Sequence, residues 1–244
     1  MHMFNMPAML STPGRKLLAG VLTALALLMA APTFATPAGQ IVIYGAHSGS
    51  TLTLSTKGNK IVVKGKMARR DQPGCRFTRG HRVAVCSARH ANSIEIQMGP
   101  SGDFVRVEEQ MPMPLTVYLG GGSDKFIGHG ERDTCFPGGA RRNRCVGGGG
   151  NDTCITGPRN SDCVGGPGDD YCRHGTGSDG CWGGPGDDVC VMGPGQDGCH
   201  GEAGNDRLYG GAQPDQLYGG RGHDYCNGGP GWGKSHTCDA GPRR

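Results

Sequence analysis

Residues 165–173 read GGPGDDYCR and residues 183–191 read GGPGDDVCV, so one nine-residue unit recurs almost unchanged two units later. The template is G-G-x-G-x-D-x-U-x, where U is apolar, and it also fits residues 147–155 (GGGGNDTCI) and 219–227 (GGRGHDYCN). Looser copies fill the gaps, and ten consecutive units keep one frame over residues 138–227. This period predicts a fold built by stacking short units.

The composition agrees with a repeat fold. The 47 glycines and 16 prolines among 244 residues would indicate low-complexity disorder if they had no period. Only 35% of the residues are hydrophobic and 6% are aromatic, which is lean for an ordinary globular core. We therefore expect glycine-rich turns that alternate with short strands.

The repeats resemble the hemolysin-type, or repeats-in-toxin (RTX), calcium-binding family, and the resemblance extends over about half of the chain. It implies that six residues of each unit form a turn and three form a strand, that two units make one coil, and that coils stack in parallel. The expected fold is all-β, a parallel β-roll (β-solenoid) of nine-residue repeats preceded by a small β-rich N-terminal module. The implied cofactor is Ca²⁺.

Glycine and aspartate suit calcium chemically. Glycine permits the positive φ angles of a tight turn and exposes main-chain carbonyl oxygens, and aspartate supplies the charged oxygen that a hard cation requires. In the family, each ion sits between stacked turns of one edge. Carboxylates one strand spacing apart, ~4.8 Å, repel one another unless they are protonated or bridged by a cation. Folding is therefore expected to depend on calcium.

Because two units make one coil, alternate turns fall on opposite edges of the roll. The first edge has an unbroken series at position six: Asp133, Asp152, Asp170, Asp188, Asp206 and Asp224. The second edge reads Asp124, Asn143, Ser161, Asp179, Asp197 and Asp215, and its turns carry Arg141, Arg142 and Arg159. We expect ions between the turns of Asp152 and Asp224, weaker occupancy at Asp179, Asp197 and Asp215, and little or none at Asn143 and Ser161.

The expected metal ligands are the six first-edge aspartates, the second-edge residues Asp179, Asp197 and Asp215, and the glycines Gly147, Gly165, Gly183 and Gly219. The alternative is that these turns bind no metal ion, since aspartate and glycine both favour tight turns without any ion.

The U positions carry an unusual number of cysteines. They are Cys135, Cys145, Cys154, Cys163, Cys172, Cys181, Cys190, Cys199, Cys226 and Cys238, with Leu208 and Leu217 in between. Twelve cysteines in an exported chain favour disulfides. Grouped by coil, the pairs are Cys135–Cys145, Cys154–Cys163, Cys172–Cys181, Cys190–Cys199 and Cys226–Cys238, which is the pattern that cross-core disulfides would produce.

Three arrangements of these cysteines stay open. Cross-core bonds need a flat roll, because facing sheets normally lie ~10 Å apart whereas a disulfide needs Cα atoms within about 7 Å. Neighbours along one sheet, such as Cys135 and Cys154, would lie ~4.8 Å apart. Reduced cysteines could also fill the core as small apolar residues. Zinc is disfavoured because the cysteines contain no C-x-x-C motif.

Residues 40–119 contain short alternating apolar runs that predict β-strands. This part looks like the leader that precedes the repeats in exported actinobacterial members of the family, where a C-x(10)-C element occurs. Here that element is Cys75 and Cys86, an expected local disulfide. Residues 99–107 (GPSGDFVRV) resemble a degenerate repeat with Asp103 in the aspartate role.

The leader is also basic. Between Lys57 and Arg89 lie ten Lys and Arg residues against one acid, Asp71. Such a run is usually a solvated face, but it could bind an anionic envelope polymer. No specific nucleic-acid partner is expected.

The first 35 residues resemble a secretory signal peptide: Arg15 and Lys16 precede an apolar run over residues 17–31, and small residues surround Ala35. The run is shorter than the ~20 residues of a spanning helix, so no transmembrane anchor is expected. The expected organisation is a signal peptide at 1–35, a β-rich basic leader at 36–118 and a calcium-binding β-roll at 119–244. The chain is expected to be secreted and extracellular.

An enzyme is not expected. The chain has no H-E-x-x-H motif, and residues 45–49 (GAHSG) have histidine where G-x-S-x-G requires serine. Two function hypotheses follow: a calcium-dependent structural or surface-matrix protein, and a calcium-gated adhesin that binds an anionic envelope partner through its basic leader.

Overall fold

The computed structural model describes residues 39–68, 74–78, 80–139, 142–231, 234–236 and 238. All of the described residues belong to one compact unit within residues 36–244. The expected signal peptide therefore lies outside the described residues. Apart from the single-turn 3₁₀ helix η1 (Gly229–Gly231), the regular structure of the described part is all β, and none of its helices could cross a membrane.

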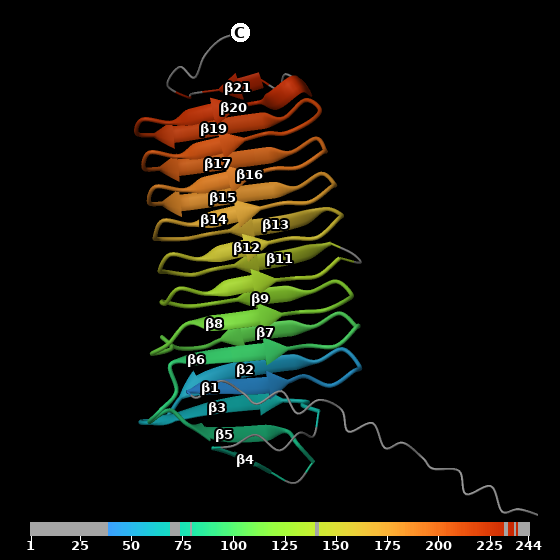
Figure 1. Ribbon diagram of the computed structural model, residues 1–244, viewed down its shortest axis with the longest axis vertical. Helices are drawn as coiled ribbons and strands as arrows, with labels where there is room; N and C mark the ends of the chain where they lie inside the picture. Colours follow the sequence, from blue (N-terminus) through green and yellow to red (C-terminus); the bar gives the residue numbers. More distant parts are fainter. Residues whose placement is uncertain are drawn as a thin grey trace, which may run out of the picture. The chain divides into compact units, whose positions relative to one another are not determined.

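Two sheets of stacked strands form this unit (Figure 1). In the described residues the first sheet has nine strands, all parallel to their neighbours. In spatial order they are β1 (Gln40–Tyr44), β6 (Ser93–Gln97), β8 (Leu115–Tyr118), β10 (Thr134–Phe136), β12 (Thr153–Ile155), β14 (Tyr171–Arg173), β16 (Val189–Val191), β18 (Arg207–Tyr209) and β20 (Tyr225–Asn227).

The second sheet has twelve strands in the described part of the chain. In spatial order they are β21 (Lys234–His236), β19 (Gln216–Arg221), β17 (Gly198–Ala203), β15 (Gly180–Pro185), β13 (Ser161–Val164), β11 (Asn143–Val146), β9 (Lys125–Ile127), β7 (Phe104–Val107), β2 (Thr51–Thr56), β3 (Lys60–Gly65), β5 (Val83–Ser87) and β4 (Cys75–Phe77).

The nine-residue unit builds the roll because its last three residues form a strand whose middle residue points inward. In β12, for example, Thr153 and Ile155 are partly exposed and Cys154 between them is buried. Glycines make the preceding turn: Gly166 and Gly168 have φ of 115° and 138°, a left-handed conformation that L side chains rarely adopt. Successive units alternate between the two sheets, which confirms the expected parallel β-roll.

The basic leader joins the same two sheets. β1 pairs with β6 in the first sheet and β2 pairs with β7 in the second, both in parallel. The chain between β2 and β6 makes β3, β4 and β5, which pair antiparallel and extend the second sheet past β2. The leader core is aliphatic, with Leu52 and Ile61 fully buried, whereas the repeat core is lined with sulfur.

Disulfides in the roll cross the core between the two sheets. Cys135–Cys145, Cys163–Cys172 and Cys181–Cys190 have Cα–Cα distances of 6.5, 6.3 and 6.5 Å. The sheets are therefore closer than the usual ~10 Å, because cysteine is too small to hold them at the spacing that leucine would need. Register neighbours along one sheet, such as Cys135 and Cys154, are not bonded to each other.

The grouping of cysteines by coil is only partly right. Cys163 bonds to Cys172 and Cys181 to Cys190, so the expected pairs Cys154–Cys163, Cys172–Cys181 and Cys190–Cys199 do not form. Cys154 and Cys199 are buried thiols. The physical reason is that coils join without a break, so a first-sheet cysteine can bond to the following cysteine, as Cys135 does to Cys145, or to the preceding one, as Cys172 does to Cys163.

Two further pairs lie at the ends of the unit. Cys75 and Cys86 face each other across β4 and β5 and form the expected local disulfide, with Cα atoms 3.9 Å apart. Cys226 bonds to Cys238 across 5.9 Å. Cys238 is not the U residue of its coil, however, because the backbone position in register with Leu217 is Ser235.

Candidate metal centre

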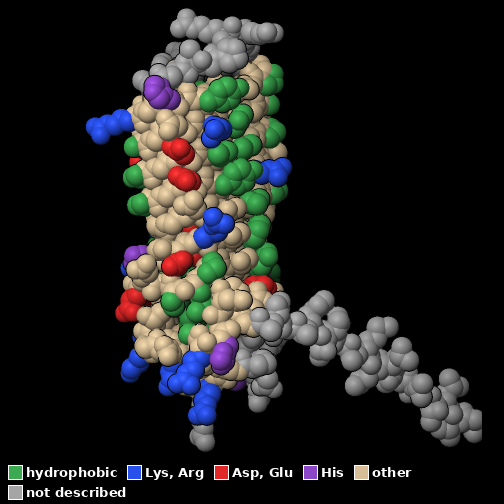
Figure 2. Space-filling model, turned by 60° about the vertical axis from the view of Figure 1, so that its left-hand side comes forward, with side chains coloured by type: hydrophobic (Ala, Val, Ile, Leu, Met, Phe, Trp, Pro, Cys, Tyr) green, Lys and Arg blue, Asp and Glu red, His purple; other side chains and the backbone are tan. Residues whose placement is uncertain are grey.

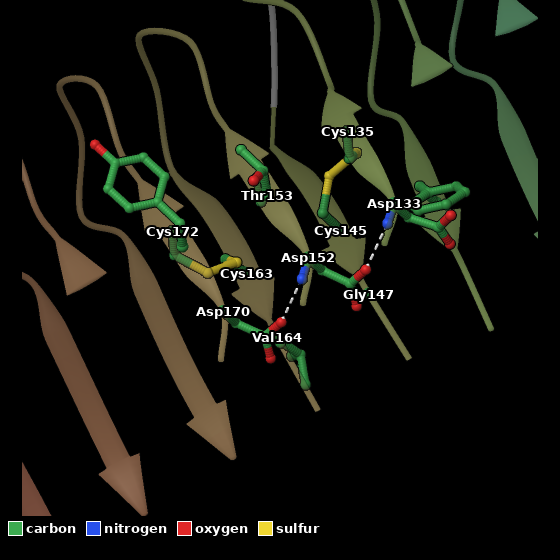
Figure 3. Close-up of a pocket in the computed structure, with 14 residues that line it drawn as sticks. Asp133, Cys135, Cys145, Gly147, Asp152, Thr153, Cys163, Val164, Asp170 and Cys172 are labelled. Carbon is green, nitrogen blue, oxygen red and sulfur yellow. Dashed lines mark hydrogen bonds between the residues drawn. A yellow bond between two sulfur atoms is a disulfide. The ribbon is translucent and has the colours of Figure 1, made fainter. Parts of the chain in front are cut away.

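The six first-edge aspartates form one file along the roll. Each stands directly before a strand of the first sheet, and each is buried, with 1–6% of its surface exposed. The Oδ1 atom of each accepts a hydrogen bond from the backbone N–H of the preceding turn in the file. Asp133 donates to Asp152 and Asp152 to Asp170, both at 2.7 Å (Figure 3). The same bond repeats up to Asp224.

The second carboxylate oxygen has no such partner. The Oδ2 atoms of Asp133, Asp152, Asp170, Asp188 and Asp206 are buried and have no hydrogen-bond partner among the described residues. A buried charged oxygen without a partner costs ~1–3 kcal/mol or more, and natural structures rarely leave one. Five such atoms in one file fit a positive ligand that repeats with the turns.

The glycine at position one makes room at each carboxylate. A Cβ added at Gly147, Gly165, Gly183 or Gly219 would overlap the Oδ2 atom of the aspartate five residues later. Gly128 shows that carbonyl oxygens also reach this place, because a Cβ there would overlap the carbonyl oxygen of Gly147 in the next turn. Carboxylate and carbonyl oxygens together are the donor set that Ca²⁺ takes in proteins, so these residues fit a calcium ion.

Burial makes these carboxylates poor acids in the absence of a metal. Burial raises the pKa of Asp152 and of Asp188 to about 8, against a weaker lowering by backbone hydrogen bonds, and neighbouring aspartates raise it further. Burial likewise raises the pKa of Asp133 and of Asp170 to about 7. A bound cation would reverse this effect, because it favours the charged form.

The second edge repeats the hydrogen-bonded file with an interruption. Ser161 donates its backbone N–H to Asp179, and the chain continues through Asp197 to Asp215 at 2.6–3.0 Å. The Oδ2 atoms of these three aspartates are also buried and lack a partner among the described residues. The hydroxyl of Ser161 instead donates to the carbonyl of Arg159, and so it supplies no carboxylate to the file.

Beyond the interruption, the second-edge file of hydrogen bonds continues from Asn143 into the leader. Asp124 donates its backbone N–H to the side-chain oxygen of Asn143, Asp103 to Asp124, and Ser50 to Asp103, at 2.6–2.8 Å. Burial raises the pKa of Asp124 to about 6 and also raises that of Asp103. Asp103 thus has the hydrogen-bonding place of a position-six aspartate.

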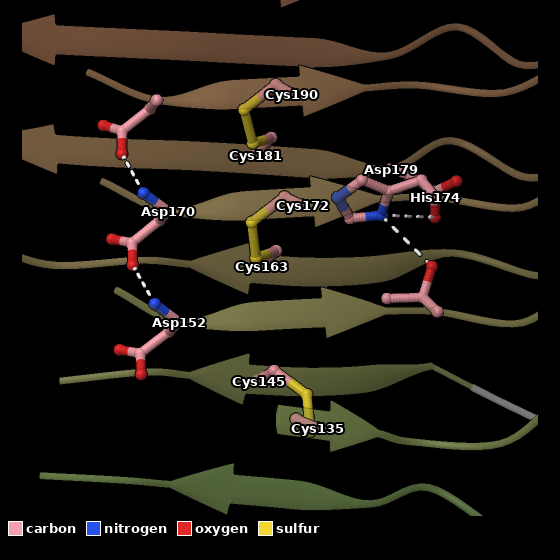
Figure 4. Close-up of a disulfide and its surroundings, with 12 residues drawn as sticks. Cys135, Cys145, Asp152, Cys163, Asp170, Cys172, His174, Asp179, Cys181 and Cys190 are labelled. Atoms are coloured by element: carbon pink, nitrogen blue, oxygen red, sulfur yellow. Dashed lines mark hydrogen bonds and ion pairs between the residues drawn. A yellow bond between two sulfur atoms is a disulfide. The ribbon is translucent and has the colours of Figure 1, made fainter. Parts of the chain in front are cut away.

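Position one distinguishes the two edges. On the second edge it is occupied in three successive turns by Thr156, His174 and Met192, all buried, where the first edge has glycine, whereas Gly210 keeps the glycine beside Asp215. His174 Nδ1 lies 4.0 Å from Asp179 Oδ1 and 3.3 Å from Thr156 Oγ1 (Figure 4). Burial lowers the pKa of His174 to about 4, so its ring is neutral at physiological pH. The His174 ring occupies the place beside Asp179 that corresponds to the place of Gly183 beside Asp188.

Sequence reasoning missed His174 as a site residue. The signal was present, since residues 174–182 read HGTGSDGCW and the first letter departs from the template. The departure gained meaning only when the structure placed position one against the carboxylate.

Comparisons with known proteins agree with the repeat. Residues 200–231 match the family model of the RTX calcium-binding nonapeptide repeat, in four copies. No curated protein and no solved structure matches the chain. The matched residues include Asp206 and Asp224 of the first edge and Asp215 of the second. The chain thus carries RTX nonapeptide repeats, and such repeats bind Ca²⁺.

Proposed function

Because residues 200–231 are RTX calcium-binding repeats, we propose that the chain is a secreted structural or surface-matrix protein that calcium assembles into a rigid roll. The observation that supports this proposal is the first-edge file of buried aspartates, whose Oδ2 atoms have no partner among the described residues. Ions bound along this edge would tie each coil to the next.

The proposed ligands are those of both edges where an aspartate remains. They are Asp133, Asp152, Asp170, Asp188, Asp206 and Asp224 on the first edge, Asp179, Asp197 and Asp215 on the second, and the position-one glycines Gly147, Gly165, Gly183 and Gly219. Bound calcium would supply positive charge to carboxylates such as Asp152 and Asp188, whose pKa burial raises to about 8. The chain itself sets the spacing between the carboxylates. For example, the backbone N–H of Asp152 donates to Oδ1 of Asp170 at 2.7 Å, which fixes these two aspartates in adjacent turns.

The experiment is far-UV circular dichroism of the full exported chain in calcium, after chelation, and after calcium is restored. We expect the β signal to fall on chelation and to return with calcium, because binding energy and folding energy are linked. Magnesium at the same concentration should fail to restore the signal, since it requires near-ideal octahedral geometry. An unchanged spectrum after complete chelation would refute calcium assembly.

A second candidate function, an adhesin for an anionic envelope polymer, is supported by a basic hollow in the leader. The hollow lies over β3, β4 and β5 and is lined by Lys57, Lys60, Arg76 and Arg89. No ion pair of these four cations is found among the described residues. Figure 2 shows Lys and Arg side chains gathered at this end of the unit.

Retention on a phosphate-bearing resin tests the adhesin. The variant with Lys57, Lys60, Arg76 and Arg89 changed to Gln should elute at clearly lower salt, because each phosphate contact releases counterions. The matched control also changes four cations of the roll to Gln, namely Arg144, Arg173, Arg207 and Arg221 in β11, β14, β18 and β19. Equal elution of both variants would exclude the hollow as the binding site.

Secretion is proposed on the sequence of residues 1–35 alone. N-terminal sequencing of the protein recovered from the growth medium should find a start at or near Thr36. A start at Met1 in the released protein would contradict cleavage.

A further inference from the structure

Eight buried cysteines form a zigzag ladder through the core of the roll. In chain order the cysteine ladder is Cys135, Cys145, Cys154, Cys163, Cys172, Cys181, Cys190 and Cys199, alternating between the first and the second sheet. Six of the eight are paired in three disulfides, and Cys154 and Cys199 are thiols. Figure 4 shows the three disulfides in one column.

Each thiol lies beside a disulfide. The sulfur of Cys154 is within 4.8 Å of both sulfurs of Cys135–Cys145. The sulfur of Cys199 is within 4.8 Å of both sulfurs of Cys181–Cys190. A thiolate at this range is placed to attack a disulfide, so neither thiol is isolated from the bonded part of the ladder.

Disulfides form in both directions along the ladder, from the first sheet to the second and from the second sheet to the first. Cys135–Cys145 runs from the first sheet to the second along the chain, with Cα atoms 6.5 Å apart. Cys163–Cys172 and Cys181–Cys190 run from the second sheet to the first, at 6.3 and 6.5 Å. The direction of pairing therefore reverses at Cys154, and geometry favours neither direction over the other.

The two thiols cannot bond directly to each other. Cys154 and Cys190 belong to one sheet, and β14 lies between their strands, so they are two strand spacings apart, ~10 Å. Cys199 is a further step across the core from Cys190. This separation exceeds the limit of about 7 Å between the Cα atoms of a disulfide.

We propose that Cys154 and Cys199 form one two-electron redox couple, connected by thiol–disulfide exchange through the two disulfides that lie between them. In the first step the Cys199 thiolate attacks Cys190, the Cys190–Cys199 bond forms, the Cys181–Cys190 bond breaks, and Cys181 leaves as a thiolate. Cys181 then attacks Cys172, and Cys163 leaves. The two steps conserve the number of thiols and disulfides, and one proton moves in effect from Cys199 to Cys163.

An external small-molecule disulfide completes the reaction. The Cys163 thiolate attacks it and releases one small thiol, and the Cys154 thiolate then displaces the second small thiol as Cys154–Cys163 forms. Two protein thiols are oxidised and one external disulfide is reduced, so electrons and protons balance.

The ends of the ladder dictate the product. Phe126 occupies the core position before Cys135, in register with Cys145, and Leu208 follows Cys190 in its sheet. Cys135 and Cys199 therefore have one cysteine neighbour each across the core. Full oxidation allows one pairing only: Cys135–Cys145, Cys154–Cys163, Cys172–Cys181 and Cys190–Cys199.

Burial sets the speed of this exchange. Burial raises the pKa of the Cys154 thiol, and burial together with nearby aspartates raises that of Cys199. The attacking thiolates are therefore scarce at neutral pH, and rearrangement should take hours and quicken as pH rises.

The test incubates the folded full chain, in calcium, with excess hydroxyethyl disulfide and then quenches it with acid. Remaining thiols are alkylated under denaturing conditions, and the disulfide-linked peptides are identified by mass spectrometry. We expect the protein to lose two hydrogens without an adduct, and peptides linking Cys154–Cys163, Cys172–Cys181 and Cys190–Cys199 to replace the two middle pairs. If Cys154 and Cys199 remain thiols, or each keeps a hydroxyethyl adduct while Cys163–Cys172 persists, the coupling is refuted.

Cys199→Ser is the matched variant. It keeps the three disulfides and the Cys154 thiol but removes the residue that begins the exchange, so the adduct-free loss of two hydrogens should disappear. Circular dichroism in calcium establishes that the variant is folded. An adduct-free loss of two hydrogens in Cys199→Ser would overturn the proposal, because it would require a bond that does not involve Cys199.

Discussion

On the first edge of the roll Gly183 lies against the carboxylate of Asp188, whereas on the second edge the ring of His174 occupies the matching place beside Asp179. Both edges keep the aspartate and both leave its Oδ2 atom without a partner among the described residues. The difference lies in the space beside that atom. We therefore expect the residue at position one to decide how much room a calcium ion has beside each aspartate.

The largest expected effect comes from removing one carboxylate from the complete edge. Asp188→Ala should weaken calcium binding by on the order of 10- to 100-fold, because calcium affinity follows the number of charged ligands and this residue borders two turns. Asp197→Ala on the second edge is the matched control and should change affinity much less. Calorimetric calcium titration of both variants measures the difference, and equal losses would contradict the ranking of the edges.

The next largest effect comes from adding a side chain at position one, beside the aspartate carboxylate. Gly183→Ala should destabilise the calcium-loaded roll by about 1–3 kcal/mol, because the added Cβ would overlap Asp188 Oδ2 and something must shift. Gly198→Ala is the control, since a Cβ at that position meets nothing within 4 Å. Thermal unfolding in saturating calcium gives the comparison. If the two variants melt together, position one is not under steric constraint.

Acidity should change calcium affinity by a smaller factor, and the change should differ between individual aspartates. Burial raises the pKa of Asp188 from its ordinary 3.8 to about 8, but raises that of Asp179 only to about 6. A raised carboxylate pKa means that the metal-free fold binds more protons than the unfolded chain between about pH 4 and pH 8. Stability of the metal-free fold therefore falls as pH rises through that window, and calcium affinity rises, by at most about tenfold per pH unit for each proton released.

Titrations at pH 6, 7 and 8 in buffers of different ionisation enthalpy would count the protons released. Between pH 7 and pH 8 the sites that contain Asp152 and Asp188, whose pKa burial raises to about 8, should still gain affinity, while a site at Asp179, whose pKa is raised to about 6, should gain little. Proton release that is zero at all three values would contradict this prediction.

The smallest expected effect is a gain of function. His174→Gly restores the template at position one and should tighten second-edge calcium binding several-fold, on the scale of ~1 kcal/mol. The gain is limited because the buried ring also fills core space. His200→Gly is the control, because His200 stacks between Trp182 and Tyr218 on the outer face of the second sheet. No gain in His174→Gly would mean that something other than this ring weakens the second edge.

The repeat frame made the roll and the sorting of its edges predictable. Aspartates that recur every two units must stack if each coil has two units, and the file from Asp133 to Asp224 follows from that spacing. The leader was less predictable, because its strands carry no period. Nothing in residues 60–87 signals that β3, β4 and β5 would pair antiparallel at the end of the second sheet.

The disulfide pairing could not be deduced from spacing either. Cysteines at equal steps of nine residues have equivalent neighbours on both sides, so Cys163 has no reason in the sequence to choose Cys172 over Cys154. His174 is a different case, because its departure from glycine was readable but its contact with Asp179 needed three-dimensional coordinates.

The most direct test is a crystal structure of the calcium-loaded chain with anomalous scattering from calcium. We expect a file of anomalous peaks along the first edge, each with an aspartate Oδ2 atom at about 2.3–2.6 Å, and weaker or absent peaks beside His174. First-edge Oδ2 atoms that bind only water or a proton, with no anomalous peak near Asp170 and Asp188, would contradict it.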